Sequence, residues 1–180
     1  INWATGYDLA TARPIENPEA RFYKTGQPFV AIPGALGAHS WHPMSYNPAT
    51  GLVYIPAQQV PQSYLNDMNE LDRRKVLGFN VGSSMSEGLL PDNPAAYRAA
   101  AASATGRLVA FDPRKGTVAW SVDYPAAWNG GTMTTAGNLV FQGTNTGRFR
   151  AYAADSGKQL LDMDVQSGVL SGPSTYSIDG

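Results

Sequence analysis

The stretch Phe111-Asp112-Pro113-Arg114-Lys115-Gly116, with Trp120 four residues beyond it, decides the fold of this chain. Three other stretches share its pattern. In each of them an aromatic residue comes first, an Asp or Asn usually follows it, and a small residue ends the stretch. They are Tyr7–Ala12, Tyr46–Gly51 and Tyr152–Gly157. The closing residues stand at positions 12, 51, 116 and 157, so they are separated by 39, 65 and 41 residues. A period near 40 residues that ends strands in tight turns is typical of a β-propeller.

The residues around these turns predict short strands. The predicted strands are Trp41–Tyr46, Leu52–Pro56, Gly106–Asp112, Thr117–Val122, Asn138–Gly143, Arg148–Tyr152 and Gln159–Val165. The long middle interval is one period plus an insertion, in which helical spacing appears over Tyr64–Leu77 and Pro94–Ala104. We therefore predict an all-β fold, a partial β-propeller with a partly helical insertion at about 59–105. The whole of residues 1–180 would be a fragment of one propeller domain, with the insertion at 59–105 lying between blades.

The turn residues have structural roles in this interpretation. Asp or Asn at the start of such a turn accepts hydrogen bonds from backbone amides two or three residues later, and the closing Gly adopts positive φ. Asp8 and Asp112 are therefore expected to bind backbone rather than to act in catalysis. Trp120 is expected to cover its turn and pack between blades, as a core residue.

The composition excludes several classes of function. The net charge is −1, which does not favour nucleic acid or an anionic membrane surface. No run of 18 apolar residues is present, so no transmembrane helix is predicted. The chain has no Cys, which rules out disulfides, zinc–thiolate sites and covalent haem attachment within this stretch. The sequence starts without Met and stops at a turn signal, so we expect it to be part of a longer protein.

Three further stretches of sequence make the β-propeller interpretation more specific. They are Gly37–Met44, Thr50–Gln58 and Trp128–Gly143. Together with the turn pattern, they resemble the tryptophan-docking repeat and the cofactor loops of the eight-bladed alcohol dehydrogenases that use pyrroloquinoline quinone (PQQ), especially the quinohaemoprotein branch. The resemblance covers residues 1–180 and is weakest over 59–105. It implies that the chain supplies later blades of such a propeller.

The resemblance also implies a chemistry and its partners. PQQ would bind near the propeller axis with Ca²⁺ on it, and an Asp base, the calcium ligands and a Cys pair would lie upstream of Ile1. The parent protein would oxidise an alcohol to an aldehyde or ketone and pass electrons to a cytochrome c or a quinone. A haem c in the parent and a periplasmic location, with or without inner-membrane association, agree with the family.

Two loops are similar to the family's cofactor-contacting segments, and they supply the candidate binding residues Ser40, Trp41, Trp128 and Asn129. The family pattern His-Asn-Trp has become His39-Ser40-Trp41, and Ser lacks the amide of Asn. In the second loop, paired Gly residues after Asn129 would let backbone approach a flat ligand. No catalytic residue and no metal ligand is predicted in this chain.

Other interpretations of these residues stay open. Trp41 and Trp128 could be core aromatics, His39 is expected to be a hydrogen-bonded structural residue, and His42 a partly exposed loop residue. A non-catalytic propeller, used as a scaffold or a ligand-binding module, is the alternative to the enzyme. A third hypothesis is a half-propeller that binds quinone without turnover, although its open sheet edges would invite aggregation. Calcium-site motifs upstream would favour the enzyme.

Overall fold

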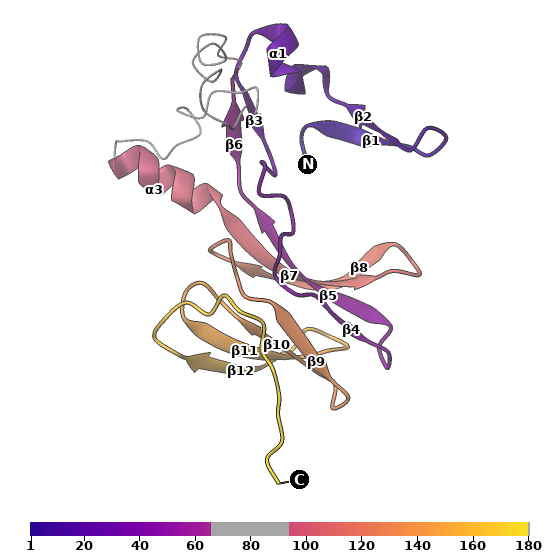
Figure 1. The fold of residues 1–180 in the computed structure, drawn as a ribbon, viewed down its shortest axis with the longest axis vertical. Helices are drawn as coiled ribbons and strands as arrows, with labels where there is room; N and C mark the ends of the chain where they lie inside the picture. Colours follow the sequence, from indigo (N-terminus) through magenta and orange to yellow (C-terminus); the bar gives the residue numbers. More distant parts are fainter. Residues whose placement is uncertain (66–93, 180) are drawn as a thin grey trace. The chain divides into compact units, whose positions relative to one another are not determined.

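The computed structural model describes residues 1–65 and 94–179. The chain divides into two units, which are described separately. Unit 1 comprises Ile1–Gly37 and Val60–Ser103, and unit 2 comprises Ala38–Gln59 and Ala104–Gly180. The repeat turns after position 40 all fall in unit 2 (Figure 1).

Unit 1 is built from short elements around two small antiparallel sheets, β1-β2 and β3-β6. Its elements are β1 (Ala4–Asp8), β2 (Arg13–Glu16), the 3-10 helix η1 (Pro18–Ala20), α1 (Phe22–Thr25), β3 (Phe29–Ala31), β6 (Gln62–Tyr64) and α3 (Pro94–Ser103). Phe29 pairs with Tyr64 and Ala31 with Gln62, so the start of the insertion joins the N-terminal segment in one sheet. The sequence did not predict this pairing.

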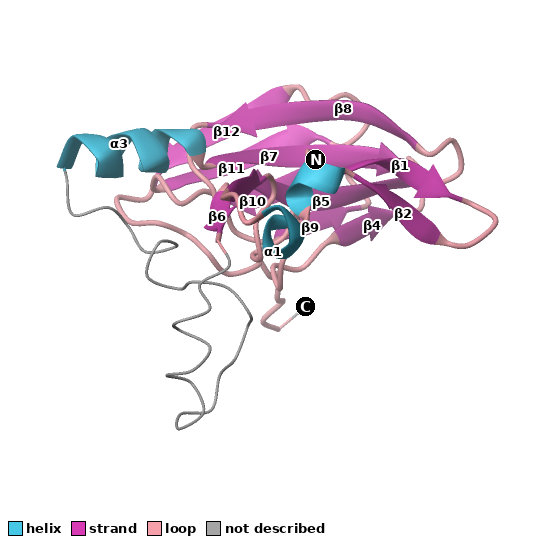
Figure 2. Ribbon diagram, turned by 90° about the horizontal axis from the view of Figure 1, so that it is seen from above, coloured by secondary structure: helices cyan, strands magenta, loops and turns pink. Residues whose placement is uncertain are grey.

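Unit 2 consists of two four-stranded antiparallel sheets, ordered β4-β5-β7-β8 and β12-β11-β10-β9. Their strands are β4 (Ser45–Asn47), β5 (Leu52–Gln59), β7 (Thr105–Asp112), β8 (Thr117–Tyr124), β9 (Thr132–Thr135), β10 (Leu139–Gly143), β11 (Arg148–Ala153) and β12 (Gln159–Asp164). Figure 1 shows the sheets as separate layers, and in Figure 2 they overlap when seen from above. Each sheet is one blade of a propeller.

The insertion leaves the first blade between two neighbouring strands. β5 ends at Gln59 and β7 begins at Thr105, and these two residues are paired in the sheet. An insertion at about 59–105 is therefore confirmed, but it lies within one blade, between β5 and β7, and not between two blades as predicted. The helix predicted at Pro94–Ala104 is α3. Tyr64 belongs to β6 rather than to a helix, and residues 66–77 of the other predicted helix lie outside the described residues.

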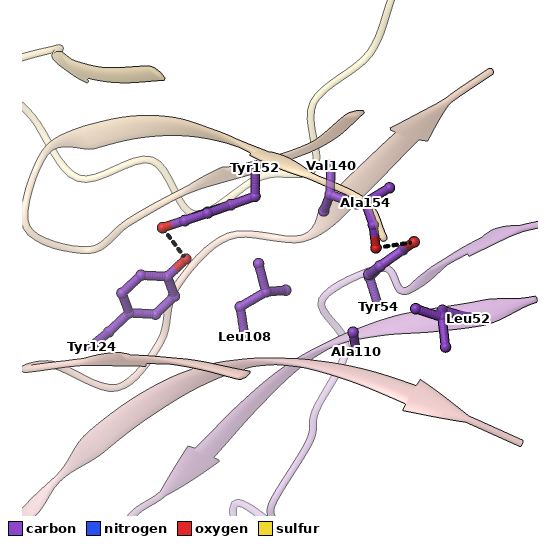
Figure 3. Close-up of a cluster of buried hydrophobic side chains, with 8 residues drawn as sticks. All are labelled: Leu52, Tyr54, Leu108, Ala110, Tyr124, Val140, Tyr152 and Ala154. Carbon is purple, nitrogen blue, oxygen red and sulfur yellow. Dashed lines mark hydrogen bonds between the residues drawn. The ribbon is translucent and has the colours of Figure 1, made fainter. Parts of the chain in front are cut away.

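The two blades enclose one core, shown in Figure 3. Side chains alternate between buried and less buried along β5 and β7, as expected for strands with one face on a core. The core residues are Leu52, Tyr54, Leu108, Ala110, Tyr124, Val140, Tyr152 and Ala154. The apolar side chains that alternate along these strands therefore form the contact between the two blades.

The predicted turns are confirmed in their details. Asp112 Oδ1 accepts from the amides of Arg114 (3.0 Å) and Lys115 (3.2 Å), and Asp8 Oδ1 accepts from Ala10 (2.9 Å). The closing residues at 12, 51, 116 and 157 all have φ between 54° and 72°. Three of these are Gly, and Ala12 shows that the turn tolerates a Cβ there with strain.

Trp120 connects the two blades. Its indole Nε1 donates to the carbonyl oxygen of Ala154 at 3.0 Å, and its ring lies so close to Gly157 that a Cβ there would be 2.7 Å from Cε3. The ring is half-buried and packs against the core. The prediction that Trp120 packs between blades is confirmed, but the turn that it covers is that of the following blade and not its own.

Candidate functional site

The two loops singled out in the sequence meet in unit 2. We call residues 39–44 the first loop and residues 128–131 the second loop. The amide of Thr132, directly after the second loop, donates to the carbonyl of Pro43 at 2.8 Å. A Cβ on Gly131 would collide with the Pro43 ring, so Gly is needed where the loops touch.

Three aromatic rings gather at this contact, which we call the aromatic cluster: Trp41, His42 and Trp128. Trp41 stacks on His42 with ring centroids 4.1 Å apart and planes 23° from parallel. Trp128 lies 5.3 Å from His42 and 6.4 Å from Trp41. Trp41 is 68% exposed, so one indole ring of the cluster lies at the surface.

His42 departs from the prediction. It was expected to be partly exposed, but it is only 4% exposed. The reason is that Trp41 stacks on its ring while Trp128 lies beside it. Burial lowers the pKa of His42, and the nearby His39 adds to this, so the imidazole is neutral at pH 7. Its Nε2 is buried without a hydrogen-bond partner among the residues described.

His39 has the structural role that the sequence predicted. Its Nδ1 lies 2.9 Å from the carbonyl oxygen of Pro56 on β5, which is a hydrogen bond with Nδ1 as the donor. This bond attaches the first loop to a strand of the first blade. Ser40 is half-buried beside it, and within the described ranges its hydroxyl has no hydrogen-bond partner.

Trp128 has a strained backbone. Its φ is +59°, a conformation that bulky residues rarely adopt and that persists only when neighbouring contacts hold it. Such strain is often found where a side chain is presented for function. The predicted site residue Trp128 is thus held in place at an energetic cost.

Hydrogen bonds of Asn129 stabilise this backbone conformation of Trp128. Asn129 is 5% exposed, its Nδ2 donates to the carbonyl of Ala126 (2.8 Å), and its Oδ1 accepts from the amide of Asn145 (3.1 Å). Asn145 Nδ2 in turn donates to the carbonyl of Ala127 at 3.1 Å. These contacts make Asn129 a support of Trp128, and its predicted direct contact with a cofactor stays a prediction.

The second loop has another buried support that sequence reasoning missed. Gln142 on β10 is fully buried, and its Nε2 donates to the carbonyl of Gly130 at 2.7 Å. Its Oε1 accepts from the hydroxyl of Tyr124 at 3.0 Å, and that hydroxyl lies 3.0 Å from the hydroxyl of Tyr152. Burial raises the pKa of Tyr124 far above its ordinary value. The signal in the sequence was a polar residue within the apolar strand Leu139–Gly143.

The paired glycines serve packing between protein segments. A Cβ on Gly130 would lie 2.7 Å from the carbonyl oxygen of Ser171 and 2.8 Å from that of Val169. The two glycines thus let backbone and Pro43 pack closely, and the predicted approach of this backbone to a flat ligand stays a prediction.

The wider surroundings set limits on the chemistry. Across residues 1–65 and 94–179, no group of three or more His, Cys, Asp or Glu side chains could hold a metal ion. A hollow of about 400 Å³ in unit 2 is lined by residues that include Ala57, Gly106 and Tyr124, but by none of the four predicted site residues. In the part of the chain that is described, no helix is long and apolar enough to cross a membrane.

Two adjacent four-stranded blades joined by a docking tryptophan define the class of this chain as a β-propeller segment. The family model for the β-propeller domain of glucose, ethanol and alcohol dehydrogenases, named after PQQ, matches residues 15–180. The chain therefore belongs to this family.

Individual relatives agree with the family. Over 180 residues the chain is 46% identical to quinohemoprotein alcohol dehydrogenase ADH IIB of Pseudomonas putida, covering 100% of this chain and 24% of the relative. It is 43% identical to the dehydrogenase subunit of an alcohol dehydrogenase (quinone) of Gluconacetobacter polyoxogenes, with the same shares covered. The solved structure of quinohemoprotein alcohol dehydrogenase ADHIIG from Pseudomonas putida HK5 matches with a TM-score of 0.88 and 41% identity, over 99% of this chain and 26% of that one. The chain thus spans about a quarter of the length of these relatives.

Proposed function

We propose that these residues are part of a PQQ-dependent alcohol dehydrogenase and that the first and second loops form one side of its quinone site. The observation that carries the proposal is the aromatic cluster, where the two loops meet and the strained Trp128 is held by buried amides. The identity of 46% over the whole chain to a quinohemoprotein alcohol dehydrogenase supports the choice of cofactor.

The residues present fit a flat aromatic cofactor with oxygen substituents. Indole rings offer flat apolar surface for stacking, and Trp41 and Trp128 lie 6.4 Å apart at the site. The half-buried hydroxyl of Ser40 and the buried Nε2 of His42 are polar groups beside these rings. The cofactor would be oriented by these loops, while Asn129 holds the backbone that presents Trp128.

When bound, PQQ with Ca²⁺ supplies the electron acceptor for oxidation of an alcohol to an aldehyde or ketone. The calcium ligands and the Asp base would lie in parts of the parent protein outside this chain. The electrons would pass to a cytochrome c or a quinone, with a haem c in the parent as one route, in the periplasm. Residues 1–180 would belong to one propeller domain, with 59–105 inserted between strands and the remaining blades as its partners.

The test uses the full protein that carries this segment, prepared without quinone and titrated with PQQ in the presence of Ca²⁺. We expect binding that quenches tryptophan fluorescence, followed by alcohol-dependent reduction of an artificial electron acceptor. In Asn129→Ala we expect about 10-fold weaker retention of PQQ, because the strained Trp128 loses its support. A wild-type protein that binds no PQQ would instead favour a non-catalytic propeller scaffold.

A matched control separates the site from general stability. Asn47→Ala removes an equally buried amide, 2% exposed, which holds a turn and Thr134. This variant should lose stability and keep its affinity for PQQ. Equal effects of Asn129→Ala and Asn47→Ala on PQQ affinity would contradict the assignment of the second loop.

A further inference from the structure

We propose that His42 binds the quinone cofactor through a hydrogen bond from its Nε2 atom to a carbonyl or carboxylate oxygen of PQQ. This inference rests on the proposed function and adds a polar binding residue to the aromatic site.

Nε2 of His42 is an exception among the buried polar groups that the structure describes. Within the described ranges it is the one buried side-chain nitrogen or oxygen, on a residue that is not exposed, that lacks a hydrogen-bond partner. Comparable side chains are all satisfied: Asn129 by two backbone groups, and Gln142 by Gly130 and Tyr124. Native proteins leave few buried polar atoms unpaired, and each such atom calls for an explanation.

The position of His42 also favours a role in binding. His42 is stacked by Trp41 and flanked by Trp128, so it lies where the two loops of the candidate site meet. A structural histidine would be expected to use its ring nitrogens as His39 does, whose Nδ1 bonds the carbonyl of Pro56. The unpaired nitrogen is thus located at the place where the ligand is proposed to bind.

Access of a ligand to Nε2 depends on the neighbouring rings. Nε2 is itself covered, so a ligand reaches it only after a neighbouring ring shifts. Trp41 is 68% exposed, so it is the less buried of the two indole rings that contact the imidazole. Trp128 is fixed by the backbone contacts around Asn129. We therefore expect Trp41 to be the ring that yields when the cofactor binds.

The imidazole ring of His42 has the chemistry that a hydrogen bond to the cofactor requires. A buried neutral imidazole carries one N–H, and the Nε2–H tautomer donates to an oxygen acceptor. A hydrogen bond to a carboxylate or a polarised carbonyl in a dry site is stronger than a bond exposed to water. Pairing on binding would remove the penalty that the unpaired nitrogen imposes on the ligand-free protein.

The unpaired nitrogen allows a test in which stability and affinity for PQQ change in opposite directions. His42→Phe keeps an aromatic ring in the stack and removes the unpaired nitrogen. In the full protein without quinone, its melting temperature should be unchanged or higher than that of the wild type. Its Kd for PQQ, measured with Ca²⁺ by quenching of tryptophan fluorescence, should be about 10- to 100-fold weaker.

Two further variants complete the test. His42→Gln places an amide N–H near the position of Nε2 and should recover most of the affinity for PQQ. His39→Phe removes a nitrogen that already has a partner, so it should lower the melting temperature of the quinone-free protein.

The outcomes are distinct. A lower melting temperature of quinone-free His42→Phe would show that Nε2 is paired within the protein and would overturn the inference. A Kd for PQQ equal to that of the wild type would overturn it as well. Failure of the wild-type protein to bind PQQ would overturn the proposed function, and this inference with it, whereas the other two results leave the proposed function intact.

Discussion

The buried carbonyl of Ala154 gives a quantitative prediction about how the blades are joined. This residue is fully buried, and its oxygen accepts two hydrogen bonds from the other blade: from the Tyr54 hydroxyl at 2.8 Å and from Trp120 Nε1 at 3.0 Å. Figure 3 shows the first of these bonds. Because one acceptor has two donors, loss of one donor still leaves the carbonyl paired.

The expected free energies follow from this geometry. Trp120→Phe removes one hydrogen bond, whereas Tyr54→Phe removes the bond to Ala154 and also a bond with the Thr50 hydroxyl at 2.9 Å. Each lost bond should destabilise the protein by about 0.5–1.5 kcal/mol. Trp120→Phe also loses part of the ring that packs on Gly157, which places it at the upper end. The double variant leaves a buried carbonyl without any donor, which costs about 1–3 kcal/mol on top of ordinary packing losses. We therefore expect the double variant to exceed the sum of the single variants by about 1 kcal/mol.

The measurement is urea unfolding of the full protein and of the three variants, compared at equal m-values. A double-mutant cycle isolates the coupling between the two donors. Single variants that add to within about 0.5 kcal/mol in the double variant would refute the idea that the two side chains share one acceptor.

Two other predictions concern the loop site. Gln142→Leu should lower stability by about 1–3 kcal/mol and weaken PQQ binding, because the carbonyl of Gly130 loses its donor; unchanged unfolding and unchanged PQQ affinity would contradict this. For His42, the folded pKa lies below the unfolded value near 6.5, so the unfolded state binds more protons as the pH falls. Stability should therefore be complete above about pH 6.5 and decline below it, and a comparison of melting temperatures at pH 7.5 and pH 5.0 should show a smaller decline in His42→Phe. Equal declines in both proteins would show that His42 does not titrate in this range.

The turns and the blades could be predicted from the sequence because their causes are local. Asp112 bonds amides two and three residues away, and Gly116 adopts a φ of +67° within the same turn. The alternation of apolar residues along β5 and β7 is equally local. Such features depend on residue types within a few positions, so the repeat was visible without coordinates.

The strand pairing in unit 1 could not be predicted from local sequence patterns. Phe29 pairs with Tyr64 across 35 positions of chain, and Asn2 bonds Val30 and Ile32 through its side chain. The strands concerned are three residues long, too short for a clear pattern of alternation. Their pairing depends on contacts distant in sequence, which no short pattern encodes.

Some features of the candidate site could likewise be predicted from the sequence, and others depend on the tertiary structure. The resemblance to the PQQ-dependent alcohol dehydrogenases, seen in the sequence alone, identified the two loops and predicted that Trp41 and Trp128 both bind the cofactor. Only the tertiary structure placed these rings 6.4 Å apart, turned Asn129 inward as a support, and buried His42 with an unpaired nitrogen. The physical reason is that residue type determines which groups can donate, accept or stack. Whether a group is buried, and which partner it finds, depends on segments nearly 90 residues apart, as in the bond from Thr132 to Pro43.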